Sequence, residues 1–216
     1  MSNIGKFIVI EGVDGAGKTT QIKKLAENLQ KQGKRVFVTS EPTCKAQTHA
    51  PTAVGSMIDN VLKGKVKMTP SAMAALFLCD RILHNTDADF GIRKLLEDGV
   101  YVICDRYYYS SFAYQGIESD LDWVIRQNLD CPDIARPDVC IFLELSPETA
   151  KARREARGEE LEIFETDDVR ADSIRDKFML VFERMGREEV RFVLADGSIE
   201  EVAERVLLAV NEAVGD

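Results

Sequence analysis

Residues 12–20 read Gly-Val-Asp-Gly-Ala-Gly-Lys-Thr-Thr, directly after the apolar run 6–11 and at the start of a helical pattern. This stretch matches the motif G-x-x-x-x-G-K-[ST] in the strand, loop and helix context that the motif requires. Glycines let successive backbone N–H groups surround a phosphate, and the following helix directs its positive end toward it. The sequence therefore predicts a nucleoside triphosphate (ATP) site formed by Gly12, Val13, Asp14, Gly15, Ala16, Gly17, Lys18, Thr19 and Thr20.

Two side chains of this loop have predicted roles in chemistry. Lys18 is expected to span the β- and γ-phosphates, and the hydroxyl of Thr19 is expected to bind Mg²⁺. The competing interpretation is a glycine-rich turn with an exposed lysine. Switch proteins and transporters carry the same loop, so the loop indicates the phosphate donor and leaves the acceptor open.

The rest of the chain alternates short apolar runs with longer helical patterns. The runs are nearly continuous in hydrophobicity, which is typical of strands buried on both faces of a parallel sheet. Five strands are predicted, at 6–11, 35–40, 100–104, 139–145 and 190–195. Helices are predicted at 18–32, 53–63, 70–97, 107–129, 147–157, 168–187 and 199–214. The pattern predicts an α/β fold, a three-layer, doubly wound, five-stranded parallel sheet flanked by helices.

Length and charge narrow the class of protein. The 216 residues suit a single domain, and the net charge of −9 argues against nucleic acid as a partner. The N-terminus does not resemble a signal peptide, and no apolar stretch approaches the length of a membrane span. We therefore expect a cytoplasmic protein without a membrane partner. The five cysteines include no C-x-x-C pair, so a thiolate metal site or a disulfide framework is not expected.

The third strand ends in Asp105-Arg106. In doubly wound sheets ligands bind at the carboxyl ends of the strands, so Asp105 is a candidate ligand for Mg²⁺ through water and Arg106 a candidate for holding an acceptor phosphate. The alternative is an ion pair at the end of the strand that caps the next helix.

Four ordered motifs, taken together, resemble the thymidylate kinase family. They are 12–21 (GVDGAGKTTQ), 41–42 (EP), 76–81 (LFxxDR) and 105–115 (DRYYYSSFAYQ). The resemblance implies the fold of the P-loop nucleoside monophosphate kinases, transfer of the ATP γ-phosphoryl group to dTMP to give dTDP and ADP, and a homodimer.

The resemblance also implies roles in binding the acceptor. Asp14 would face the acceptor sugar, Phe77 would stack on thymine, and Arg81 would donate to an exocyclic oxygen of the base. Arg106 would hold the acceptor phosphate and Tyr114 would lie against the deoxyribose. The remaining substrate-binding candidates are Glu41, Ser111 and Gln115.

Spacing supports part of this assignment without the family. Phe77 and Arg81 are four residues apart and share a helix face, so an aromatic ring and a forked donor can approach one flat ligand. The alternative is that Phe77 belongs to the core and that Arg81 pairs with Asp80 or another surface acid.

A basic segment after the fourth strand resembles the lid of the family, at about residues 151–168. Arg153 and Arg157 are four residues apart on one predicted helix face. Residues 13–16 of the phosphate loop contain no cation, so we expect one of these two arginines to neutralise the transferred phosphoryl group. The alternative is a solvated basic face balanced by nearby glutamates.

Two segments leave the substrate open. Asp59 stands where an arginine is common in the family, and Lys45 or His49 could replace that charge, or the pocket could accept a different monophosphate. The turn 195–198 resembles the turn beside adenine, but it could equally be a simple strand-to-helix connection. The competing functions are a kinase for another nucleotide or a deoxynucleoside, and a non-catalytic P-loop nucleotide-binding protein.

Overall fold

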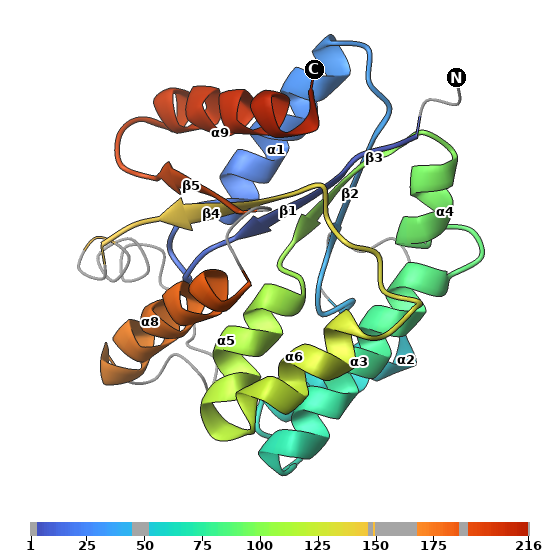
Figure 1. The fold of residues 1–216 in the computed structure, drawn as a ribbon, viewed down its shortest axis with the longest axis vertical. Coiled ribbons are helices and arrows are strands. Elements are labelled where there is room, and N and C mark those ends of the chain that lie inside the picture. Colours follow the sequence, from blue (N-terminus) through green and yellow to red (C-terminus); the bar gives the residue numbers. More distant parts are fainter. Residues whose placement is uncertain (1–3, 45–51, 147–148, 150–167, 186–189, 216) are drawn as a thin grey trace.

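The computed structural model describes residues 4–44, 52–146, 149, 168–185 and 190–215. A parallel sheet of five strands, in the order β2-β3-β1-β4-β5, forms the middle layer (Figure 1). The strands are β1 Phe7–Glu11, β2 Val36–Ser40, β3 Tyr101–Asp105, β4 Val139–Glu144 and β5 Val190–Leu194. The helices are α1 Lys18–Lys31, α2 Ala53–Leu62, α3 Pro70–Thr86, α4 Ile92–Glu97, α5 Tyr108–Glu118, α6 Leu121–Leu129, α8 Asp168–Arg184 and α9 Ile199–Val214. The predicted fold class is confirmed.

The central strand β1 divides the core into two parts. Phe7 and Val9 point to one face of the sheet, where they join Cys104 and Phe142 in one buried cluster. Ile8 and Ile10 point to the opposite face and belong to a second cluster with α1 and α9. Every residue of β1 is buried, which explains why its sequence is continuously apolar up to Glu11.

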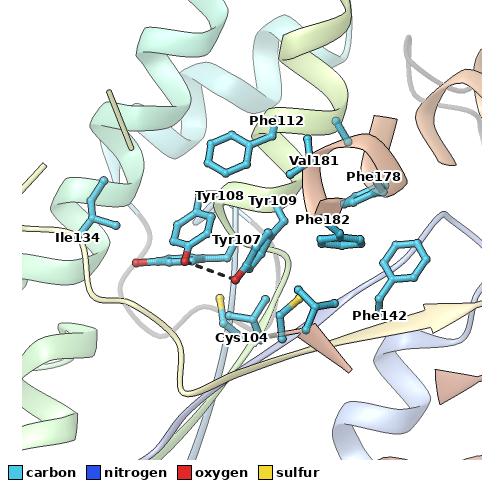
Figure 2. Close-up of a cluster of buried hydrophobic side chains, with 14 of the residues drawn as sticks. Cys104, Tyr107, Tyr108, Tyr109, Phe112, Ile134, Phe142, Phe178, Val181 and Phe182 are labelled. Atoms are coloured by element: carbon cyan, nitrogen blue, oxygen red, sulfur yellow. Dashed lines mark hydrogen bonds between the residues drawn. The ribbon is translucent and has the colours of Figure 1, made fainter. Parts of the chain in front are cut away.

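Helices α1 and α9 pack on one face, whereas α3, α5, α6 and α8 lie on the other (Figure 1). Aromatic side chains join α5 to α8 and the sheet, as Figure 2 shows. The ring centroids of Tyr109 and Phe182 are 5.7 Å apart, and those of Phe142 and Phe178 are 5.1 Å apart. This packing fixes α5, the helix that follows the Asp105-Arg106 pair.

Two predicted helices are wrong in their extent, because each breaks into two. The helix predicted at 70–97 ends at Thr86, and Asp87 then accepts hydrogen bonds from the N–H groups of Asp89 and Phe90, at 3.0 and 2.8 Å. Gly91 then starts α4, at a point where a Cβ atom would lie 2.3 Å from the Asp87 carbonyl oxygen.

The helix predicted at 107–129 breaks at Ser119, whose backbone is extended. Asp120 caps the next helix by accepting from the Trp123 N–H at 2.8 Å. Of the predicted helix 147–157, only Thr149 belongs to the described residues, and its N–H donates to Ser146 Oγ at 3.2 Å. In the part of the chain that the structure describes, no helix is long and apolar enough to cross a membrane.

Candidate active site

The phosphate loop connects β1 to α1 at the carboxyl edge of the sheet. Three of its glycines have positive φ angles, Gly12 at 150°, Gly15 at 88° and Gly17 at 93°. A Cβ atom at Gly12 would lie 3.0 Å from the Leu143 carbonyl oxygen in β4, so glycine is required there both for conformation and for space. Gly17 begins α1 without a side-chain cap, which leaves the positive end of this helix for an anion.

Lys18 folds back over the loop in the ligand-free protein. Its Nζ donates to the carbonyl oxygens of Gly12 and Val13, at 3.1 and 3.3 Å, and to Asp14 Oδ1 at 3.2 Å. Lys18 is only 8% exposed. This burial, together with the charge of Arg106, lowers the pKa of Lys18. An anion bound in the loop would therefore stabilise a charge that the protein itself holds at a cost.

Arg106 also contacts the carboxylate of Asp14. Its NH2 forms an ion pair with Asp14 Oδ1, and its NH1 donates to Ser110 Oγ at 3.1 Å. The guanidinium carbon lies 5.2 Å from the ring centroid of Tyr114. The structure thus brings together Asp14 and Lys18 of the motif 12–21 with Arg106 and Tyr114 of the motif 105–115.

Asp105 ends β3 beside the phosphate loop, because β3 pairs with β1 and places Asp105 opposite Ile10. Asp105 is 8% exposed, and its Oδ1 has no hydrogen-bond partner among the described residues. Its charge also acts on Lys18, whose pKa it raises against the larger effect of burial. Thr19, in the first turn of α1, is exposed. A buried carboxylate oxygen without a partner among the described residues and a hydroxyl in the first turn of α1 fit the oxygen ligands that Mg²⁺ prefers.

Glu11, which the sequence analysis did not select, is fully buried at the end of β1. Its Oε1 accepts from the N–H groups of Tyr107 and Ser110, at 2.9 and 3.1 Å, and its Oε2 accepts from Ser110 Oγ at 2.7 Å. Burial raises the pKa of Glu11, and the charge of Arg106 opposes that rise. The signal in the sequence was a single acid at the end of an otherwise apolar strand.

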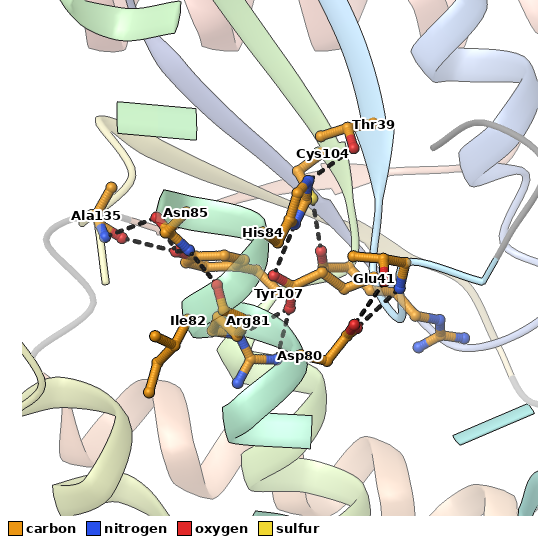
Figure 3. A network of polar contacts seen from close by, with 12 residues as sticks. Thr39, Glu41, Asp80, Arg81, Ile82, His84, Asn85, Cys104, Tyr107 and Ala135 are labelled. Carbon is orange, nitrogen blue, oxygen red and sulfur yellow. Dashed lines mark hydrogen bonds and ion pairs between the residues drawn. The ribbon is translucent and has the colours of Figure 1, made fainter. Parts of the chain in front are cut away.

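The acceptor side of the site contains a buried polar network (Figure 3). Arg81 is 1% exposed, its Nε donates to Glu41 Oε2 at 2.7 Å, and its NH2 donates to Ser111 Oγ at 3.1 Å. Its NH1 donates to Asn128 Oδ1. Arg81 therefore pairs with Glu41 and not with its neighbour Asp80.

Two further members of this network, His84 and Asp80, were not selected from the sequence. His84 lies between Thr39 Oγ1, at 2.8 Å from its Nε2, and Glu41 Oε1, at 3.1 Å from its Nδ1. Because a carboxylate only accepts, Nδ1 donates to Glu41. The histidine and Arg81 together hold both oxygens of the Glu41 carboxylate.

Asp80 accepts hydrogen bonds from residues on both sides of the segment 45–51. It accepts from the Thr43 N–H at 2.8 Å and from the hydroxyl of Thr52 at 2.5 Å. Thr52 also caps α2 by accepting from the Gly55 N–H at 2.7 Å. A Cβ atom at Gly55 would lie 2.4 Å from Thr43 Oγ1, so this contact requires glycine. A buried acid thus sets the spacing between β2 and α2.

The remaining acceptor candidates differ in their surroundings. Phe77 is half-buried and packs against a small cluster of α2 and α3 that contains Ile58 and Met73. Gln115 and Ser111 are buried, and Tyr114 is half-buried, with its pKa raised by burial. The structure joins Ser111 to Arg81, and Phe77 packs against this cluster with part of its side chain exposed.

The turn 195–198 both caps a helix and lines a pocket. Ser198 accepts from the Glu201 N–H at 3.3 Å, and the Glu201 carboxylate accepts from the Ser198 N–H at 2.8 Å, so α9 begins with a reciprocal cap. A pocket of about 260 Å³ lies between this turn and the start of α1, lined by Gly17, Gln21, Gly197 and Ser198 among others. Its position next to the phosphate loop fits the base of a nucleotide bound there.

Several predicted residues lie outside the described part of the chain. These are Arg153 and Arg157 of the predicted lid, and Lys45 and His49, which could replace a missing cation. Asp59, the acid at the position where an arginine is common, lies in α2 and pairs with Lys63 at 2.7 Å. The charge of Asp59 is therefore neutralised by a lysine one helical turn away.

The sheet order, the phosphate loop after its central strand and the Asp-Arg pair at the end of the adjacent strand define a P-loop nucleotide kinase. Sequence comparison matches residues 10–206 to the thymidylate kinase family. The chain is 37% identical over 212 residues to a probable thymidylate kinase of Pyrococcus abyssi, covering 95% of this chain and 96% of the relative.

It is also 32% identical to a thymidylate kinase of Desulfotalea psychrophila, covering 98% of this chain and 96% of that protein. A thymidylate kinase of Exiguobacterium is 34% identical, with 94% and 92% of the two chains covered. The chain belongs to the thymidylate kinase family, and phosphorylation of dTMP is its activity. A kinase for another nucleotide and a non-catalytic binding protein are not favoured.

Proposed function

We propose that this protein transfers the γ-phosphoryl group of Mg²⁺-bound ATP to dTMP with Lys18 and Arg106 as the two cations of the reaction. The proposal rests on one observation. Asp14 Oδ1 accepts from Lys18 Nζ at 3.2 Å and also pairs with Arg106. The cation of the donor loop and the cation at the end of the adjacent strand therefore converge within the reach of one carboxylate oxygen, where a phosphoryl group in transfer needs positive charge on both sides.

In the reaction, an oxygen of the dTMP phosphate attacks the γ-phosphorus of ATP, and the bond from that phosphorus to the β,γ-bridging oxygen breaks. The electron pair of the broken bond stays on ADP. Lys18 neutralises charge on the β- and γ-phosphates, and Arg106 orients the attacking phosphate through its planar, forked donors. Thr19 and, through water, Asp105 would hold Mg²⁺, which would supply further charge neutralisation on the triphosphate.

Recognition of the nucleoside falls to the residues on α3 and α5. Phe77 would stack on thymine, and Arg81, Ser111 and Gln115 would supply the polar contacts to the base. Tyr114 would lie against the deoxyribose, with Asp14 facing the sugar once the phosphates have replaced it as partner of the two cations. Glu41 contributes indirectly, because it fixes Arg81.

The wider assignment has three parts. The chain acts as a single domain, residues 1–216, with a lid at about 151–168 that supplies Arg153 or Arg157 to the transferred group. It works in the cytoplasm as a homodimer, without a nucleic acid or membrane partner. The net charge of −9 argues against nucleic acid as a ligand but is compatible with small anionic nucleotides, because these need only a local basic site.

A panel of monophosphates and nucleosides, assayed for ADP release with Mg²⁺ and ATP, tests the proposal. We expect dTMP to be the best acceptor, and Arg106→Ala to raise the dissociation constant of dTMP while leaving that of ATP close to wild type. A better acceptor other than dTMP would refute the substrate assignment. ATP binding without ADP release for any acceptor would favour a binding protein instead.

A further inference from the structure

The buried carboxylate of Glu11 organises the start of α5 from a different strand. The residue that begins this helix, Tyr107, provides no side-chain cap. Instead Glu11 Oε1 accepts from the N–H groups of Tyr107 and Ser110, at 2.9 and 3.1 Å. The Ser110 N–H also donates to the Tyr107 carbonyl oxygen at 3.1 Å, whereas Glu11 is the acceptor for the Tyr107 N–H. Glu11 therefore does for α5 what an N-cap residue does for its own helix.

The backbone that Glu11 holds is strained. Arg106 has a φ angle of 65°, in the left-handed region that a residue with a side chain rarely adopts. Both ends of this strained residue are fastened to β1, because the Arg106 N–H donates to the Ile10 carbonyl oxygen at 3.0 Å and the Tyr107 N–H donates to Glu11. The direction in which the Arg106 side chain leaves the backbone therefore depends on Glu11.

A second link runs through the Ser110 hydroxyl. It donates to Glu11 Oε2 at 2.7 Å and accepts from Arg106 NH1 at 3.1 Å. A hydroxyl has one proton, and an ionised carboxylate can only accept, so Glu11 turns the lone pairs of Ser110 toward the guanidinium. One side chain thus controls both the backbone and the polar partner of Arg106.

We propose that Glu11 is a positioning residue for the acceptor phosphate and acts through Arg106 and Ser110. The inference rests on the proposed function of Arg106. This role of Glu11 and the mere presence of its negative charge predict different effects on nucleotide binding. Removing a buried negative charge from a phosphate site tightens the binding of both nucleotides, whereas loss of the positioning contacts weakens the binding of the monophosphate alone.

Glu11→Gln is the first test, with dissociation constants for dTMP and for ATP measured separately by calorimetry. Gln retains one acceptor oxygen but cannot accept from both the backbone and the Ser110 hydroxyl as the carboxylate does. We expect the dissociation constant of dTMP to rise about tenfold, the size of one misdirected charged hydrogen bond, with that of ATP unchanged or lower. Equal changes for the two nucleotides would overturn the inference.

A double-mutant cycle with Arg106→Ala separates positioning from general damage. If Glu11 acts through Arg106, Glu11→Gln has less than about a twofold effect on dTMP binding once Arg106 is absent. Additive effects would contradict the inference. If Arg106→Ala alone leaves dTMP binding unchanged, the proposed function of Arg106 fails, and the role of Glu11 fails with it.

Two further variants complete the test. Glu144→Gln is the matched control, since Glu144 is the last residue of the adjacent strand β4 and pairs with Arg175, at 3.0 Å, away from Arg106. We expect it to leave both dissociation constants unchanged. Ser110→Ala keeps the two backbone contacts of Glu11 and decides the question if Glu11→Gln does not fold. A folded Ser110→Ala variant with wild-type dTMP binding would overturn the inference.

Discussion

Asp14→Asn is expected to destabilise the ligand-free protein and to make its stability depend on phosphate. In the wild type, Asp14 is the shared partner of Lys18 and Arg106. Asparagine keeps a hydrogen-bond acceptor of the same shape but removes the charge. The two nearly buried cations then repel each other without a counter-ion, and an anion from solution can take the place of the lost carboxylate.

The size of the effect follows from the geometry of the pair. At the 3.2 Å that separates Asp14 Oδ1 from Lys18 Nζ, the Coulomb energy is roughly 1 kcal/mol in water and roughly 5 kcal/mol at an effective dielectric constant of 20. The Asp14 side chain is 30% exposed, so solvent screens part of this interaction. We expect a loss of about 1–3 kcal/mol, which corresponds to about 2–4 °C in Tm for each kcal/mol in a chain of this length.

The measurement is thermal and urea unfolding of wild type and variant across a series of inorganic phosphate concentrations. Phosphate should raise the Tm of Asp14→Asn more than that of the wild type, because it binds a site that has lost its internal anion. The control is Asp59→Asn, which breaks the exposed pair with Lys63 and should cost less than about 0.5 kcal/mol at every phosphate concentration. Equal stability and equal phosphate response of Asp14→Asn and wild type would refute this reasoning.

Three other perturbations test the site. Lys18→Met should abolish transfer yet stabilise the free protein at neutral pH, because burial lowers the pKa of Lys18. Urea unfolding should show that this stabilisation shrinks as pH rises toward 10.5, the pKa of lysine in the unfolded chain, above which the wild-type lysine is neutral in both states. Asp105→Asn should raise the Mg²⁺ concentration for half-maximal activity in a titration at fixed ATP, and an unchanged Mg²⁺ titration would argue for a structural aspartate. Arg153→Ala or Arg157→Ala should lower kcat by on the order of a thousandfold and KM far less, with Arg154→Ala the mildest of the three; steady-state kinetics in which all three variants stay within about twofold of wild type would remove the lid from catalysis.

The strands and the phosphate loop were predictable because their signals are local. A strand buried on both faces reads as a continuous apolar run, and the loop motif specifies its own glycines and lysine. Asp105 and Arg106 were predictable for the same reason, since they directly follow such a run. From these local patterns, Lys18, Asp14 and Arg106 were predictable as residues of one site.

The helix breaks were less predictable because the signals for helix ends are weak. Asp87 and Asp120 end or begin helices through hydrogen bonds to N–H groups two or three residues away. Acids occur as often on the exposed faces of helices, so their presence at 87 and 120 did not by itself interrupt the helical pattern.

The buried polar contacts were not predictable, because each joins distant parts of the chain. Glu11 meets Ser110, and Asp80 meets Thr43, across gaps that no spacing rule covers. Arg81 shows the limit of the spacing argument. It lies in one helix with Phe77, as the spacing predicted, but the choice of Glu41 as its partner depends on how β2 packs against α3.

The central position of β1 has a consequence for synthesis of the chain. Of the five strands, β1 leaves the ribosome first, but its partners come much later, with Phe7 opposite Val102 and Ile8 opposite Val139. Until those residues are made, the segment Phe7–Glu11 has two unpaired backbone edges and exposed apolar side chains, the kind of surface that aggregates or recruits chaperones. A nascent chain that stops before β4 therefore contains the whole phosphate loop but cannot enclose the strand that carries it.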